Sequence, residues 1–225
     1  MTKTILITGA NRGLGLALSE QYRADGWNVL ATCRNPQGAD ALKDLGLEPL
    51  ELDVTDEASL TALRQKLDGE SIDILFSNAG VFGPRGLELG ELDSKVWLEV
   101  LNINTVAPAM LAQAFVQNVA ASQEKLMVFM SSSMGSITDT SGGEYIYRSS
   151  KAALNMVAAS LAQDLRSQGI RSVAMRPGWV STDMGGDEAP LSPKVSASGV
   201  KTTLDNLSAT ETGVFLSHDR SSVDW

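Results

Sequence analysis

A tyrosine and a lysine four residues apart, Tyr147 and Lys151, are the side chains of this sequence best suited to acid–base chemistry. Residues at this spacing lie on one face of an α-helix, so a helix through this segment places the phenol beside the ammonium group. A free tyrosine has a pKa of about 10, and a neighbouring cation can lower the pKa of an acid by roughly 1–3 units. The pair therefore predicts a tyrosine that works as a general acid or base.

A glycine-rich segment near the N-terminus has the composition of a phosphate-binding turn. Gly9, Gly13 and Gly15 stand between a short apolar run and a helical pattern, with the spacing G-x-x-x-G-x-G. Glycines let the backbone turn tightly and approach a pyrophosphate at a helix N-terminus, where free N–H groups attract anions. We expect this turn to bind a dinucleotide, together with the residues between the glycines, which are Asn11, Arg12 and Leu14.

The residue that follows the second predicted strand indicates which dinucleotide is bound. An NAD site places an acidic residue there to hold the ribose, whereas an NADP site places an arginine near the 2′-phosphate. Here the strand is followed by Arg34 and no carboxylate, and Arg12 is a second candidate cation. Two guanidinium groups can clamp a phosphate through charge-assisted hydrogen bonds, so the sequence favours NADP(H) over NAD(H).

The elements that must position these residues alternate regularly along the chain. Apolar runs predict strands at 4–8, 27–33, 48–53, 72–77, 125–131, 170–175 and 214–217, and helical patterns fall at 13–23, 39–45, 57–67, 94–118, 145–166 and 195–207. Such alternation is typical of an α/β fold with a mostly parallel sheet and helices on both faces. We expect one domain over 1–225, with a loop at 185–199 and a substrate lid at about 184–199.

Composition excludes several classes of function. A net charge of −9 argues against a nucleic-acid or anionic-membrane partner, which a basic surface would attract. The single cysteine, Cys33, and the single histidine, His218, leave no internal disulfide and no zinc site built on several histidines. The N-terminal apolar run is too short for a signal peptide and predicts a strand, so we expect a cytoplasmic protein without a metal site.

Taken together, the motifs resemble those of the short-chain dehydrogenase/reductase family over essentially the whole chain. The glycine turn, Asn78-Ala79-Gly80, the serines before Gly135, Tyr147-x-x-x-Lys151 and Pro177-Gly178 occur in the family's order. Segments 31–36, 133–137 and 148–155 are similar to the branch of small carbonyl reductases that includes the sniffer and C-factor proteins. The resemblance implies a doubly wound Rossmann fold with a seven-stranded sheet and an NADPH-dependent reduction of a ketone or aldehyde.

The resemblance also implies roles for individual residues. Tyr147 would be the general acid and Lys151 would lower its pKa and bind the nicotinamide ribose. Ser132 would hold the substrate oxygen, with Ser133 as the alternative, and Asn104 would carry a water toward the lysine. Further cofactor contacts are implied at Asp53, Val54, Asn78, Ala79, Gly80, Pro177, Gly178, Val180 and Thr182.

The resemblance also raises two alternative functions and an oligomeric state. The C-factor resemblance raises a signalling or regulatory protein that binds NAD(P), and a sugar-nucleotide epimerase is disfavoured by the short segment after Pro177. The family often builds a homodimer or homotetramer through the helices expected at 94–118 and 145–166. The expected partner is otherwise a small carbonyl or alcohol substrate.

Overall fold

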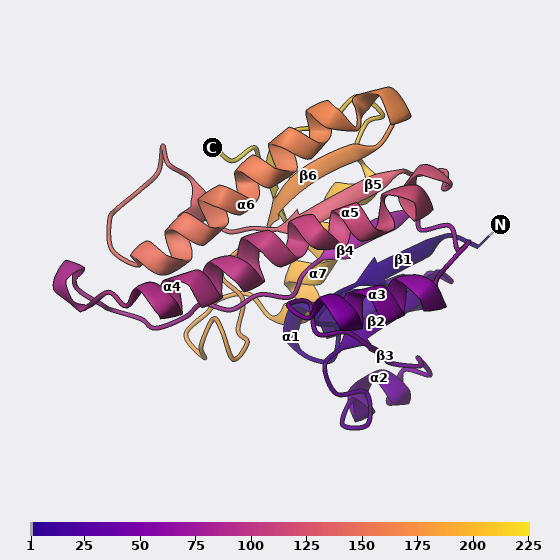
Figure 1. Cartoon of the computed structure of the whole chain (residues 1–225), viewed down its shortest axis with the longest axis horizontal. Helices are drawn as coiled ribbons and strands as arrows, with labels where there is room; N and C mark the ends of the chain where they lie inside the picture. Colours follow the sequence, from indigo (N-terminus) through magenta and orange to yellow (C-terminus); the bar gives the residue numbers. More distant parts are fainter. Residues whose placement is uncertain (1) are drawn as a thin grey trace.

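The fold is a seven-stranded sheet covered by helices on both faces, as seen in a computed structural model that describes residues 2–225 (Figure 1). The strands are β1 (Thr4–Ile7), β2 (Asn28–Cys33), β3 (Leu50–Glu51), β4 (Ile74–Ser77), β5 (Leu126–Met130), β6 (Arg171–Arg176) and β7 (Val214–Ser217). The helices are α1 (Gly13–Ala24), α2 (Asp40–Asp44), α3 (Glu57–Lys66), α4 (Ser94–Leu101), α5 (Ala107–Ala120), α6 (Tyr145–Asp164) and α7 (Pro193–Asp205).

All paired strands run parallel, in the order β3-β2-β1-β4-β5-β6-β7. The chain therefore builds outward from β1 in one direction, then crosses back to continue with β4 on the other side. Loops that leave the carboxyl ends of β1 and β4 diverge at this crossover, which is where doubly wound folds bind ligands. The expected doubly wound fold with a parallel sheet is confirmed.

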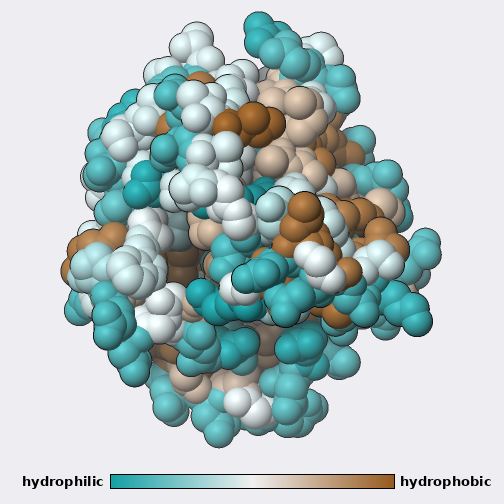
Figure 2. All heavy atoms as spheres, turned by 90° about the vertical axis from the view of Figure 1, so that its left-hand side faces the viewer, coloured by the Kyte–Doolittle hydropathy of each residue, from teal (hydrophilic) through white to brown (hydrophobic). Residues whose placement is uncertain are grey.

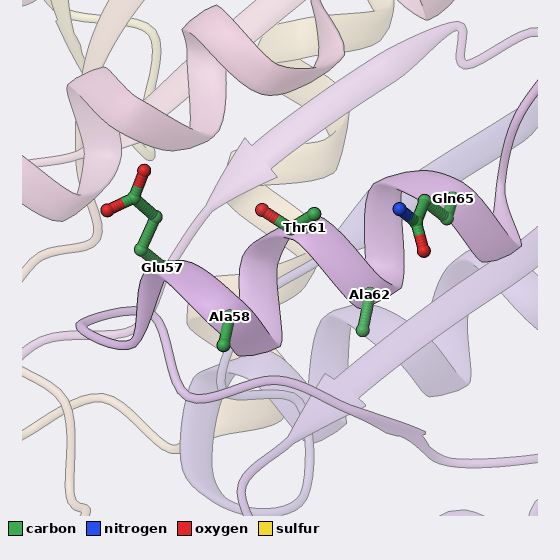
Figure 3. Close-up of a pocket in the computed structure, with 5 residues that line it drawn as sticks. All are labelled: Glu57, Ala58, Thr61, Ala62 and Gln65. Atoms are coloured by element: carbon green, nitrogen blue, oxygen red, sulfur yellow. The ribbon is translucent and has the colours of Figure 1, made fainter.

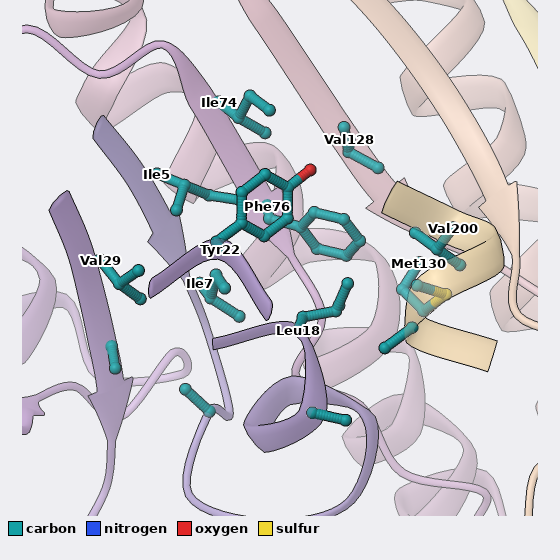
Figure 4. Close-up of a cluster of buried hydrophobic side chains, with 14 of the residues drawn as sticks. Ile5, Ile7, Leu18, Tyr22, Val29, Ile74, Phe76, Val128, Met130 and Val200 are labelled. Atoms are coloured by element: carbon teal, nitrogen blue, oxygen red, sulfur yellow. The ribbon is translucent and has the colours of Figure 1, made fainter. Parts of the chain in front are cut away.

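Alternating side chains of the strands supply two separate cores. Ile5 and Ile7 face the layer of α1, α2 and α7, where they meet Tyr22 and Phe76 (Figure 4). Leu6 faces the opposite layer of α3, α5 and α6. Because both faces of the central strands are buried, these strands are apolar at nearly every position.

Three expected elements differ from the structure. The helix expected at 94–118 is divided into α4 and α5 by a π-helical turn over Asn102–Val106. Pro108 explains the division, because it has no N–H to donate to the carbonyl of Asn104, four residues earlier. The strand expected at 48–53 is reduced to Leu50–Glu51 at the edge of the sheet.

The irregular segment after β6 ends earlier than expected. The loop ends at Ser192, whose side chain accepts a hydrogen bond from the N–H of Val195 and caps α7. The expectation of a loop over 185–199 is therefore wrong for its last seven residues, whereas the role of 184–199 as a substrate lid stays a prediction. Pro193 at the first turn and the burial of Ala197 against α1 explain why this part is helical.

Within residues 2–225, no helix combines the length and the apolar character that crossing a membrane requires.

Candidate active site

Tyr147 and Lys151 lie on the first two turns of α6, and both are almost completely buried. Their exposed fractions are 7% and 5%. The Nζ atom of Lys151 lies 5.7 Å from the centre of the Tyr147 ring and donates a hydrogen bond to the carbonyl oxygen of Met130, at 2.8 Å. This bond ties the lysine to the carboxyl end of β5, so the phenol and the ammonium group are held at one edge of the sheet.

Burial dominates the pKa values of this pair. It raises the pKa of Tyr147 to about 12, although a hydrogen bond with the Ser132 side chain and the charge of Arg85 oppose the rise. Burial also lowers the pKa of Lys151 to about 8. Desolvation of the phenolate thus outweighs the opposing effects of Ser132 and Arg85 on the pKa of Tyr147, and the expectation that Lys151 lowers this pKa stays a prediction.

The structure separates the serines that follow β5. Ser132 precedes a short turn, its hydroxyl group lowers the pKa of Tyr147, and its Oγ accepts a hydrogen bond from the N–H of Met134 at 3.2 Å. Ser131 instead donates to the side chain of Asn155 at 2.6 Å and is buried. Within residues 2–225, Ser132 is the serine that lowers the pKa of Tyr147, and Ser133 has no such effect. The hydroxyl next to the phenol is therefore that of Ser132.

Asn104 is fully buried at the centre of the π-helical turn. Its Oδ1 accepts from the N–H of Val81 at 2.9 Å, and its Nδ2 donates to the carbonyl of Val81 at 2.8 Å and to Ser150 at 2.9 Å. A Cβ atom at Gly80 would lie 3.1 Å from this Oδ1 and 3.5 Å from the Nζ atom of Lys151. Asn104 thus fixes the loop after β4 beside the lysine, and only glycine leaves space between them.

The glycine turn has the geometry that a pyrophosphate requires. Gly9 and Gly13 adopt φ values of 64° and 54°, and a Cβ atom at Gly15 would lie 2.4 Å from the carbonyl oxygen of Gly9. No side chain caps the first turn of α1. The first N–H groups of the helix have no intrahelical partner, so they remain available to an anion. Leu14 packs against the core beneath the turn.

Thr8, which sequence reasoning did not single out, connects the turn to the loop after β4. Its Oγ1 accepts from the N–H groups of both Asn78 and Ala79, each at 3.0 Å. The side chain of Asn78 donates back to the carbonyls of Thr8 and Gly9, at 2.9 and 3.2 Å. The sequence did hold one signal for this contact, because Thr8 directly follows β1. The carboxyl ends of parallel strands lie side by side, so its hydroxyl group can reach the loop that follows the neighbouring strand β4.

The candidate cations Arg12 and Arg34 are exposed, and Asp53, for which an adenosine contact is expected, is half-buried. Arg12 forms an ion pair with Asp183 from the loop after β6. Arg34 is exposed after β2, and its charge contributes to a lowered pKa of Asp53, whose main cause is hydrogen bonding by Thr55. The adjoining Val54 packs against the core, and Asn11 in the turn is half-buried.

The residues expected near the nicotinamide follow β6. A Cβ atom at Gly13 would lie 3.3 Å from the methyl group of Thr182, so the loop after β6 contacts the glycine turn. Gly178 has a φ of 83°, and Val180 forms an isolated bridge with Leu191. Pro177 accepts a hydrogen bond from Ser196 at 2.7 Å, which anchors this loop on α7.

Two further residues that the motifs did not indicate stand over the phenol. The ring of Phe82 stacks on Tyr147 with centroids 4.2 Å apart, and the guanidinium carbon of Arg85 lies 3.8 Å from the centre of the Phe82 ring. Phe82 lies more than sixty residues before Tyr147 in the sequence, so no local pattern could reveal that these two rings stack. Figure 2 faces the side that holds the loops after β4, β5 and β6, and the surface there is hollowed, with apolar atoms at its floor.

A second concave surface lies away from these residues, on the outer face of α3 (Figure 3). All of its lining residues come from this one helix, among them Ala58, Thr61 and Ala62. It brings together no acid–base pair, so the chemistry of the molecule concentrates at the carboxyl edge of the sheet.

Comparison with known proteins agrees with this arrangement. The profile of the family described as short chain dehydrogenase matches residues 3–190. The C-signal protein of Myxococcus xanthus is 36% identical over 155 residues, which cover 68% of this chain and 93% of that protein. The structure of the carbonyl reductase Sniffer of D. melanogaster superposes with a TM-score of 0.93 at 35% identity, with both chains covered completely. The NADPH-bound carbonyl reductase from chicken fatty liver gives a TM-score of 0.91 at 33% identity, over 100% of this chain and 99% of that one.

Proposed function

The chain belongs to the short chain dehydrogenase family, and from this membership we propose that it is an NADPH-dependent reductase of ketones or aldehydes. The observation that carries the proposal is the cluster of the buried Tyr147 and Lys151 with the half-buried Ser132 at the carboxyl edge of the sheet. The likeness to an NADPH-bound carbonyl reductase supports the same cofactor and reaction class.

The residues present fit a dinucleotide. The uncapped N-terminus of α1 offers N–H groups to the pyrophosphate, and Gly15 permits the close approach. Arg34 is exposed and can contact a 2′-phosphate directly. Arg12 can contact the same phosphate once its ion pair with Asp183 has opened. When bound, NADPH supplies the hydride that the carbonyl carbon receives.

The side chains of the protein then supply the proton and stabilise the charge that its transfer leaves. Tyr147 donates its phenolic proton to the carbonyl oxygen, which becomes the hydroxyl of the alcohol, while Ser132 donates a hydrogen bond to the same oxygen. Lys151 uses one of its three N–H donors on Met130, so two remain for the cofactor ribose and the phenol. Its positive charge favours the phenolate that forms when the proton has left.

Replacement of Tyr147 by phenylalanine tests the assignment. We expect NADPH to bind with unchanged affinity, measured by quenching of protein fluorescence, and carbonyl reduction to fall by about a hundredfold or more. Tyr145→Phe is the matched control, because Tyr145 is 39% exposed and lies two residues earlier on the same helix. A Tyr147→Phe protein that reduces carbonyl compounds as well as the parent would show that the assignment is wrong.

The C-signal relative favours a second candidate, a role in signalling. A protein that only binds NADPH needs the glycine turn but not a buried acid–base cluster, so the cluster favours catalysis. Consumption of NADPH with a panel of ketones and aldehydes distinguishes the two functions.

A further inference from the structure

The stack above Tyr147 extends from the buried phenol to an exposed cation. Phe82 lies almost parallel to Tyr147, with 18° between the ring planes, and Arg85 covers the Phe82 ring. The separations of 4.2 and 3.8 Å place the guanidinium carbon at most about 8 Å from the centre of the Tyr147 ring. A positive charge therefore lies within the length of a small substrate from the group that we propose donates the proton.

The guanidinium group of Arg85 has donors to spare. It carries five N–H bonds, and its one recorded hydrogen bond goes to the carbonyl oxygen of Met184. No carboxylate of residues 2–225 forms an ion pair with it. The neighbouring Glu144 is bound instead to the N–H of Gly86, at 3.1 Å. A guanidinium that rests flat on a ring presents its N–H bonds at its edge, in the geometry that a carboxylate accepts.

The surroundings of Arg85 suit an apolar substrate with one negative charge. Met184, which Arg85 binds, is 36% exposed, and Trp179 from the same loop is 56% exposed. With a net charge of −9, the protein repels anions at long range, so an anionic substrate needs a local cation. The charge of Arg85 reaches the phenol, since it lowers the pKa of Tyr147 against the larger effect of burial.

We propose that Arg85 binds a carboxylate of the substrate, and that the enzyme therefore prefers carbonyl compounds that carry a carboxylate a few carbon atoms from the reacting carbonyl. This inference rests on the proposed reductase function and names the substrate class of the same site. Phe82, stacked between Tyr147 and Arg85, holds the guanidinium in place near the phenol.

A pair of substrates that differ only in charge tests the proposal. Initial rates of NADPH oxidation are measured with benzoylpropionate and with its methyl ester, for the wild type, Arg85→Met and Arg64→Met. We expect the wild type to show a kcat/KM about tenfold higher for the acid than for the ester, and added salt to reduce this ratio. Arg85→Met lowers the value for the acid alone, so that the ratio falls to about one. Arg64 is an exposed arginine on α3 and its variant keeps the wild-type ratio.

Turnover of the ester is the internal control for folding and cofactor binding in each variant. Equal kcat/KM values of the wild type for acid and ester would overturn the role of Arg85 and leave the reductase function intact. A preference for the acid that survives in Arg85→Met, or a loss in that variant that is equal for both substrates, would overturn it as well. The latter result would assign Arg85 to holding the Met184 loop. A wild type that reduces no carbonyl compound overturns the proposed function, and with it this inference.

Discussion

The buried Lys151 should make the folded protein less stable near neutral pH, and its replacement by methionine should reverse that cost. Burial lowers the pKa of this lysine from 10.5 to about 8. Each pH unit between the folded and unfolded values corresponds to about 1.4 kcal/mol, so the charge costs about 3 kcal/mol at pH 7. The substitution also removes the hydrogen bond to Met130, which lowers the gain in stability by about 1 kcal/mol. We expect Lys151→Met to raise the free energy of unfolding by about 2 kcal/mol at pH 7 while it abolishes reductase activity.

The pH dependence of stability is a second, independent measurement of the cost of burying Lys151. Between pH 8 and 10.5 the folded state holds fewer protons at Lys151 than the unfolded state does, so stability rises with pH in this window. Above pH 10 the raised pKa of Tyr147 opposes this rise, because the folded state then holds the extra proton. Urea unfolding at pH 7, 8, 9 and 10 should therefore show an advantage of Lys151→Met that shrinks as the pH rises.

Lys201→Met is the matched control for this prediction. Partial burial lowers the pKa of Lys201, but its hydrogen bonds and ion pairs with Asp205 and Asp25 outweigh burial and raise it. This lysine contributes stability below its unfolded pKa, so its replacement should destabilise the protein at pH 7. A Lys151→Met protein that loses stability at pH 7, or an advantage that is constant from pH 7 to 10, would refute the argument from burial.

Two further predictions concern single hydroxyl groups. Ser132→Ala should lower kcat/KM for carbonyl reduction by about a hundredfold, because a hydrogen bond to the reacting oxygen is lost. Ser133→Ala should change kcat/KM only a few-fold. Steady-state rates of both variants check this, and a larger loss in Ser133→Ala than in Ser132→Ala would assign the role to Ser133. Tyr22 has a buried hydroxyl group without a recorded partner, and burial holds its pKa far above the ordinary value. Tyr22→Phe should therefore raise the free energy of unfolding in urea by about 1 kcal/mol, and a loss of similar size would contradict the reasoning.

Local patterns in the sequence predict much of this fold because burial repeats with the period of each element. Ile5-Leu6-Ile7 is apolar throughout because both of its faces are covered, and the glycine turn follows it directly. The four-residue spacing of Tyr147 and Lys151 likewise depends only on the helix between them. Such features need no knowledge of distant contacts.

The rest depends on residues that are remote in sequence. The partner of Asn104 is Val81, and the ring above Tyr147 belongs to Phe82, so neither contact leaves a local signature. Whether the pKa of Tyr147 is raised or lowered depends on how completely the phenol is desolvated, and the spacing of Tyr147 and Lys151 does not indicate the degree of desolvation. The break before α5 had a visible cause in Pro108, but a helical period continues across it.

The π-helical turn at Asn102–Val106 acts as a one-residue insertion in an otherwise continuous helix, closed by the N–H of Ala107 on the carbonyl of Asn102. Deletion of one residue from it would restore regular α-helical winding and leave the buried faces of α4 and α5 in phase, but it would remove the widened turn that holds Asn104. Asn104 would then lose its hydrogen bonds to Val81, and the loop after β4 would no longer be fixed beside Lys151. The number of residues in this stretch is therefore constrained more tightly than most of their identities, and homologous chains that share this site should vary there by substitution rather than by changes in length.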